Sequence, residues 1–223
     1  MKVTLQIPEN LNEITLAQYQ HWSKITENEE INSFYQQKMV EIFCKASLRE
    51  VLRMKVTDLE DVTDSLDKMF KVKSKFTPTF VLNNVEYGFI PKLDDMTFGE
   101  FIDLDNYLSK WETMHLAMTV LFRPIKLRRK NKYLIEEYET ADKHNLKNMP
   151  LGVCMGALLF FWTLSQELLN HTLKYLSQQK EVDIPQDLRD SIKNGAGFNL
   201  FTDSVTETLL PFQKSQSSNS IDV

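Results

Sequence analysis

One short phrase occurs twice in this chain of 223 residues, and it fixes where two helices begin. The first copy runs from Ile7 to Tyr19, and the second, one residue shorter, from Ile90 to Phe101. In each copy a Thr is followed three residues later by a side chain with an oxygen acceptor: Thr15 with Gln18, and Thr97 with Glu100. This spacing is that of a capping box, in which the two residues satisfy each other's backbone N–H groups. The repeat therefore predicts two helices that start in the same way.

Two further patterns mark helix starts. Each copy has an apolar residue before the cap and an aromatic residue on the first turn, which is the pairing of a hydrophobic staple: Ile14 with Tyr19, and Met96 with Phe101. A third Thr-x-x-Glu sequence, Thr57 to Glu60, predicts another capped helix that begins there. An acidic break at residues 27–30 separates the Thr15 helix from a second helix that contains Tyr35 and Met39.

Alternation of apolar and polar residues predicts the strands. Met1 to Ile7 alternates and is expected to be a strand. Residues 76–82 and 85–90 flank Asn83 and Asn84, which favours a tight hairpin whose first strand Pro78 places at a sheet edge. A second hairpin is expected at 124–127 and 133–135, around a polar turn at 128–132.

Two long helices complete the predicted fold. The Thr97 helix is expected to run to Leu121, with a bend near Asp105, before Pro124. Another begins after Met149 and contains Gly152 and Gly156, which either allow a close helix neighbour or have no packing role. The predicted class is α+β, mainly α-helical with two small β-hairpins. We expect an N-terminal strand and helical subdomain (1–75), a hairpin-plus-helix core domain (76–200) and a C-terminal tail (201–223), with a short helix near residue 185.

Composition narrows the functional classes. A net charge of -5, with 42% hydrophobic and 26% charged residues, is that of an ordinary globular protein and argues against a dedicated nucleic-acid binder. Cys44 and Cys154 lie in apolar helical stretches and are expected to be buried, reduced thiols. The apolar stretch at 150–164 is shorter than the roughly 20 residues that span a bilayer, so we expect a core helix and no membrane span.

The sequence holds no recognisable catalytic arrangement. Its four histidines, at positions 21, 115, 144 and 171, have no zinc-ligand spacing, and no phosphate loop or nucleophile elbow is present. We therefore predict no catalytic residue, no cofactor and no metal site, and interpret His115 as a packing residue. An acidic run could hold a divalent cation, but helix capping is the favoured interpretation: Asp94, Asp95, Glu100, Asp103 and Asp105.

Five basic residues gather in the second predicted hairpin, where they could contact phosphates or an acidic protein face: Lys126, Arg128, Arg129, Lys130 and Lys132. Charged hairpin tips also occur for solubility alone, and that interpretation is preferred. Only Tyr133 offers a nearby aromatic ring, whereas single-strand binders interleave several.

Several stretches resemble a family of tailed-bacteriophage proteins, notably from crAss-like phages of gut Bacteroidales. The similarity covers about residues 76–170 and is carried by 87–105, 121–125, 133–138, 149–152 and 160–162. The layout is also similar to that of tail assembly chaperones, in which a T-x-G-E helix start follows a small β element. Phe122 departs from the Tyr expected before Arg-Pro, and the first copy of the phrase has Ala17 and Gln18 in place of Gly99 and Glu100.

The resemblance implies a non-enzymatic bacteriophage virion structural, cargo or assembly protein that acts by protein–protein contacts, in the virion or the infected host cytoplasm. Its partners would be other phage structural proteins, with self-association left open. One alternative is a tail assembly chaperone absent from the mature particle. Another is a nucleic-acid-associated packaging or regulatory factor that uses the five basic residues. A metal-dependent hydrolase built on the acidic run is the least favoured hypothesis.

Overall fold

The computed structural model describes residues 5–26, 32–130 and 132–178, and side chains as far as Leu164. The helices of this part of the chain are α1 (Leu16–Thr26), α2 (Ser33–Phe43), α3 (Leu48–Val51), α4 (Val56–Lys71), α5 (Phe98–Leu108), α6 (Met114–Leu121) and α7 (Leu151–Gln178). Its short 3-10 helices are η1 (Leu11–Glu13), η2 (Leu93–Asp95), η3 (Trp111–Thr113) and η4 (Leu146–Asn148). Its strands are β1 (Thr79–Leu82), β2 (Val85–Phe89), β3 (Phe122–Arg129) and β4 (Lys132–Ile135).

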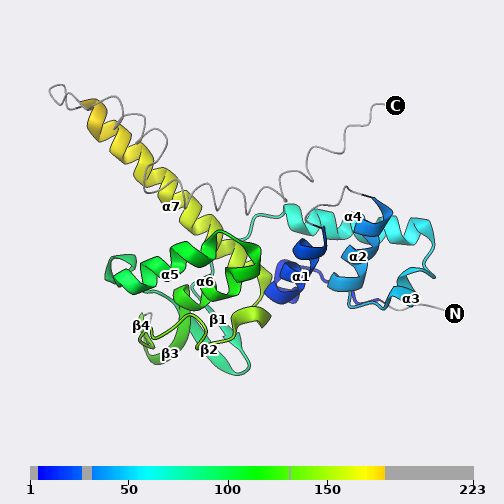
Figure 1. Ribbon diagram of the computed structural model, residues 1–223, viewed down its shortest axis with the longest axis horizontal. Helices are drawn as coiled ribbons and strands as arrows, with labels where there is room; N and C mark the ends of the chain where they lie inside the picture. The colour runs from blue at the N-terminus through cyan, green and yellow to red at the C-terminus, as the bar shows by residue number, and fades with distance from the viewer. Residues whose placement is uncertain (1–4, 27–31, 131, 179–223) are drawn as a thin grey trace.

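The elements occupy two ends of an elongated molecule. Helices α1 to α4 lie at one end, the sheet with α5 and α6 lies at the other, and α7 starts between them and projects outward (Figure 1). One hydrophobic cluster includes buried residues from both ends, and the edge-on contact between Tyr19 and Trp111, with ring centroids 4.4 Å apart, joins them. The division into subdomains at residue 75 stays a prediction.

The strands form a single antiparallel sheet in the order β1-β2-β3-β4. The predicted class, α+β and mainly helical, is confirmed, and the two expected hairpins are joined by pairing between β2 and β3. Asn83 and Asn84 have φ values of 49° and 63°, the positive values that a two-residue hairpin turn requires. Strand β1, which follows Pro78, lies at an edge as expected.

A glycine on β2 allows the sheet to close around a tyrosine. A side chain at Gly88 would lie 2.6 Å from the ring of Tyr133 on β4, which reaches across β3. The Tyr133 hydroxyl donates to the Phe89 carbonyl at 2.9 Å. Gly88 is therefore required where this ring passes over the neighbouring strand.

One predicted strand and one predicted helix start were wrong. Leu5 to Ile7 form no strand, and residues 1–4 of the same prediction lie outside the described residues. Helix α4 begins at Val56 after Lys55, which makes no side-chain cap, so Thr57 stands inside the first turn instead of capping it. The extended backbone of Lys55 (φ -70°, ψ 151°) marks the cap position, and Val56 at the start of the helix is exposed, so the helix begins one residue before the predicted box without a packing contact there.

The helix expected from Thr97 to Leu121 is two helices. It breaks after Leu108, beyond the bend expected near Asp105. The Thr113 hydroxyl donates to the Tyr107 carbonyl at 2.8 Å, satisfying a backbone acceptor near the end of α5. The break also turns Trp111 into the core, where it contacts Tyr19.

The second hairpin is longer than expected. Strand β3 begins at Phe122, directly after α6, and includes Pro124. Arg128, Arg129 and Lys132 belong to the paired strands, so the predicted five-residue turn was too long. Their charge suggested a turn. The structure instead places these residues in strands, with their side chains exposed.

The long helix α7 starts where predicted, and its glycines allow close contacts with the short 3-10 helix η1 and with the segment that follows α4. A side chain at Gly152 would lie 2.4 Å from the Asn12 side chain, and one at Gly156 would lie 2.4 Å from the Lys75 carbonyl oxygen. Both cysteines are free and buried, as expected. Among the described residues no helix is long and apolar enough to cross a membrane. The helix predicted near residue 185 and the tail at 201–223 lie outside the described residues.

Candidate functional site

The first copy of the phrase contains the predicted capping hydrogen bonds at the start of α1. The Thr15 N–H donates to Gln18 Oε1 at 3.0 Å, and the Gln18 N–H donates to Thr15 Oγ1 at 3.2 Å. The remaining group of the Gln18 amide, Nε2, donates to the Ile42 carbonyl on α2 at 2.7 Å. One neutral amide therefore caps α1 and joins it to the end of α2.

The second copy has the same box at the start of α5 with a different outward partner. The Thr97 N–H donates to Glu100 Oε2 at 2.6 Å, and the Glu100 N–H donates to Thr97 Oγ1 at 3.2 Å. The other carboxylate oxygen, Oε1, lies 2.7 Å from Nη2 of Arg123 on β3. Glu100 is 3% exposed and Arg123 7%. This box therefore joins a helix to a sheet through a buried ion pair.

Each box also borders a groove. The first groove, of about 660 Å³, is lined by Thr15 and Gln18 together with His21, Lys38 and Glu41. The second groove is larger, about 1070 Å³, and Thr97, Glu100 and Arg123 lie in its wall. The second groove is also lined by the segment before α5, including Ile90 and Pro91, and by residues 132–138, which form β4 and the chain that follows it. It therefore follows the strand at the edge of the sheet.

The hairpin side of the second groove combines apolar and basic side chains. Leu127 pairs with Leu134 across β3 and β4, and these side chains are 58% and 62% exposed. The next pair on the same face is Arg129 with Lys132, because alternate residues of a strand share a face. The groove thus offers an exposed leucine pair beside two cations.

The structure brings together only two of the five predicted basic residues in this groove. Arg129 and Lys132 line it, whereas Arg128 pairs with Glu86 at 2.6 Å and lies 5.9 Å from the Tyr133 ring centroid. Lys126 and Lys130 are exposed and do not line it. The five basic residues therefore do not all border this groove.

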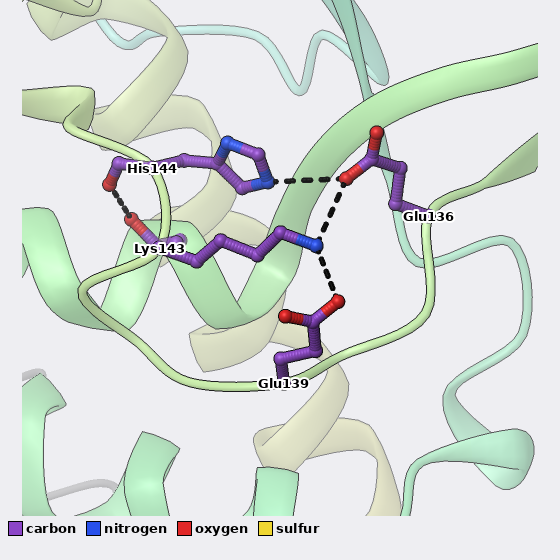
Figure 2. A network of polar contacts seen from close by, with 5 residues as sticks. Glu136, Glu139, Lys143 and His144 are labelled. Atoms are coloured by element: carbon purple, nitrogen blue, oxygen red, sulfur yellow. Dashed lines mark hydrogen bonds and ion pairs between the residues drawn. The ribbon is translucent and has the colours of Figure 1, made fainter.

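A polar network lies in the segment that follows β4, between Glu136 and His144 (Figure 2). Lys143 Nζ lies 2.6 Å from a Glu139 oxygen and 3.4 Å from a Glu136 oxygen, and His144 Nε2 lies 3.3 Å from the same Glu136 oxygen. The hydrogen bond and charge of Lys143 lower the pKa of Glu139, and Glu139 in turn raises the pKa of Lys143. The Thr119 hydroxyl donates to the His144 carbonyl at 3.0 Å, which attaches the network to α6.

Tyr138 connects the groove to α5. Its hydroxyl donates to Asp103, and its ring centroid lies 5.8 Å from the Arg123 guanidinium. Burial, and then the hydrogen bond to Asp103, raises the pKa of Tyr138 well above its ordinary value. Nε of Arg123 is buried and has no hydrogen-bond partner among the described residues.

In the part of the chain whose side chains are described, the acidic run and the histidines do not gather into a metal site. Asp95 faces Lys92 at 3.9 Å, Asp103 accepts from Tyr138, and Glu100 caps its helix, so these acids turn to separate partners. His115 Nδ1 lies 3.1 Å from Gln20 Nε2, between α6 and α1. Among the described side chains, which extend to Leu164, no three His, Cys, Asp or Glu residues are grouped as metal ligands.

Sequence reasoning missed several residues of the groove. Arg123 follows a run of three apolar residues, Val120 to Phe122, but Arg is mostly exposed in proteins, so the sequence did not mark this side chain as buried. Leu127 and Leu134 stand among the cations that drew attention to the turn. The contacts of Lys143 and His144 with Glu136 have no local sequence signal, because they depend on how the segment after β4 folds back.

The chain matches no family model, and neither the curated proteins nor the solved structures contain a match to it.

Proposed function

We propose that this chain is a non-enzymatic bacteriophage virion structural, cargo or assembly protein that works by binding other phage proteins. The observation that carries the proposal is the second groove, in which an exposed leucine pair, two cations and a strand edge lie together. Apolar anchors surrounded by polar groups are typical of protein-binding surfaces. The resemblance of residues 76–170 to tailed-phage proteins supplies the phage context.

The second element that supports protein contacts is α7. Its 28 residues correspond to a length of about 42 Å. Side chains are buried or half-buried from Leu151 to Phe161, and Trp162 and Leu164 are exposed. Helix α7 projects away from the rest of the molecule (Figure 1). A projecting helix with exposed large apolar residues suits a binding role.

Protein partners are favoured over nucleic acid by the charge of the second groove. Asp95, Glu136 and Glu137 line it together with the cations, and carboxylates repel phosphates. The Tyr133 ring is engaged by Gly88 and Arg128, so it is not a free stacking platform.

The test is affinity capture of the tagged chain from infected host cells, followed by mass spectrometry. We expect enrichment of a phage structural protein, with recovery reduced in the variant Leu127→Ser/Leu134→Ser. The matched control is Leu52→Ser, which also removes an exposed leucine, 69% exposed after α3 at the other end of the molecule. Capture of no phage protein, or equal loss in the control, would overturn the proposal.

Mass spectrometry of purified virions distinguishes the two forms of the proposal. Presence in a fixed ratio to the capsid protein identifies a structural or cargo component. Presence only in infected cells identifies an assembly chaperone.

A further inference from the structure

Helix α5 exposes apolar side chains along one side. Phe98 is 77% exposed, and Phe101 and Ile102 are exposed as well. They lie together because residues three and four positions apart share one side of a helix. Asp105 follows on that side and Asp94 precedes the helix; both are exposed, and among the described residues neither forms an ion pair. We call these five residues the acidic aromatic face.

A second exposed apolar surface lies around α3 and carries the opposite charge. Leu48, Leu52 and Val56 are exposed, Val56 by 71%. The Leu52 N–H donates to the Leu48 carbonyl at 3.0 Å, so the two leucines stand one turn apart on the same side. Residues 45–56 contain a single acid, Glu50, which is hydrogen-bonded in the capping box of α3. The three apolar residues make up what we call the basic leucine face, together with four exposed basic residues of this segment: Lys45, Arg49, Arg53 and Lys55.

The two faces complement each other and cannot meet within one copy. Helices α3 and α5 lie at opposite ends of the molecule (Figure 1), so a contact between the faces joins two copies. Pairing either face with itself would bring like charges together. Pairing one face with the other brings opposite charges together and covers apolar side chains on both sides. Because one chain carries both halves of this complement, the occupant that fits each face is a second copy of the chain.

We propose that copies of this chain associate head to tail, with the acidic aromatic face of one copy on the basic leucine face of the next. The contact is heterologous, so a copy that uses one face keeps the other free, and the assembly either closes into a ring or continues as a filament. Neither face contains a residue that lines the second groove. The inference therefore goes beyond the proposed function and needs no phage partner.

Two variants of the full chain block one face each. Asp94→Lys/Asp105→Lys reverses the charge of the acidic aromatic face, and Leu52→Ser/Val56→Ser removes apolar side chains from the basic leucine face. In sedimentation velocity, the original chain should form larger species as its concentration rises. Each variant should associate at least about tenfold more weakly, because like charges meet in the first and apolar contact is lost in the second.

Mixing the two variants distinguishes a head-to-tail contact from a symmetric one. Each variant keeps the face that the other has lost, so an equimolar mixture should form a complex of two copies and no larger species. The charges are tested separately by adding Arg49→Glu/Lys55→Glu to Asp94→Lys/Asp105→Lys, which reverses both faces. This chain should associate at least about threefold more tightly than Asp94→Lys/Asp105→Lys alone.

Two controls make the same kinds of change elsewhere. Asp61→Lys/Asp64→Lys reverses two exposed acids of α4, and Leu127→Ser/Leu134→Ser removes two exposed leucines of the second groove. Both should associate like the original chain. Circular dichroism of each variant checks that the fold is kept.

A chain that is monomeric at every concentration would overturn the proposal. So would association that the blocking variants do not weaken, or that their mixture does not restore. The two proposals fail separately, because they rest on different surfaces. Leu52→Ser is expected to weaken self-association without loss of phage-protein capture, and Leu127→Ser/Leu134→Ser is expected to do the reverse.

Discussion

The two copies of the repeated phrase begin their helices alike and then connect them to different surroundings. At α1 the capping side chain is Gln18, whose Nε2 donates to the Ile42 carbonyl. At α5 it is Glu100, whose second oxygen accepts from Arg123. An amide is needed where the neighbour is an acceptor, and a carboxylate is needed where the neighbour is a cationic donor. The capping box sets the helix start, and its fourth residue is selected by tertiary structure.

The surroundings of the first turn also differ. Leu16 and Tyr19 of α1 are buried, and the Leu16 N–H donates to the Met149 carbonyl at 2.9 Å, tying the start of α1 to the approach to α7. On α5, Phe98 and Phe101 are exposed, the latter by 55%, so the second predicted staple is not buried like the first. The first turn of α1 is therefore packed into the core, whereas the first turn of α5 has aromatic side chains exposed at the surface.

The largest effect is expected for Arg123→Met. The substitution keeps an unbranched apolar chain but removes the cation beside Glu100, which remains 3% exposed with only its capping N–H partner. Breaking a buried ion pair from one side costs about 3 to 5 kcal/mol. Urea unfolding at neutral pH measures the loss, with Arg128→Met, whose ion pair is exposed, as the control. Equal and small losses in the two variants would contradict this expectation.

A smaller loss is expected for Gln18→Glu, which gives the first box the residue of the second. The carboxylate keeps the cap but faces the Ile42 carbonyl without a proton to donate, at a cost of about 2 kcal/mol at neutral pH. Protonation restores a donor, so the difference from the original chain should shrink towards about pH 4. Chemical unfolding at the two pH values provides the measurement. A cost that does not depend on pH would show that the lost donor is not its cause.

The contact between Gln20 on α1 and His115 on α6 predicts that the stability of the fold depends on pH. Gln20 Nε2 reaches His115 Nδ1, and burial, followed by the nearby Lys147 charge, lowers the pKa of His115. The folded state therefore binds this proton less readily than the unfolded state. Its contribution to stability is complete above the ordinary pKa of 6.5 and is lost as the pH falls through the lowered value.

The effect is expected to be below about 1 kcal/mol, because His115 is partly exposed. His115→Asn can still accept a hydrogen bond from Gln20 but does not titrate. Unfolding free energies should therefore fall less steeply below about pH 6.5 in the variant than in the original chain. Parallel pH profiles would rule out this role of His115.

The smallest effect is expected for Gly99→Ala, which gives the second copy the residue that Ala17 provides in the first. A side chain at Gly99 would meet no atom within 4 Å. Ala is a better helix former than Gly, so thermal or urea unfolding should show a gain of about 0.5 kcal/mol. Gly156→Ala is the contrasting control, because its side chain would lie 2.4 Å from the Lys75 carbonyl oxygen. A loss of stability at position 99 would indicate a contact that the geometry does not contain.

The sequence predicted local structure better than it predicted partners. Capping boxes, the Asn83-Asn84 turn and the start of α7 are local, because each depends on residues a few positions apart. The break after Leu108 was missed because it depends on the packing of Trp111 against Tyr19, which is far away in the sequence. Thr57 was misread because a Thr-x-x-Glu spacing also occurs inside a helix.

The candidate site was only partly predictable for the same reason. Arg129 and Lys132 were expected from their charge, and Thr97 and Glu100 from their spacing. That these four residues border one groove depends on the pairing of β2 with β3, which brings the start of α5 beside the second hairpin. No local pattern contains that pairing.

The most direct measurement is the unfolding free energy of Glu100→Gln in two backgrounds, the original chain and Arg123→Met. Gln keeps the capping oxygen but turns an NH2 group toward the buried Arg123 guanidinium, so the substitution should cost about 3 to 5 kcal/mol while Arg123 is present. With Met at position 123 no cation remains to be paired, and the same substitution should cost less than about 0.5 kcal/mol or stabilise the fold. An equal cost in both backgrounds would show that Glu100 acts only as a helix cap and that its charge is not selected by the sheet.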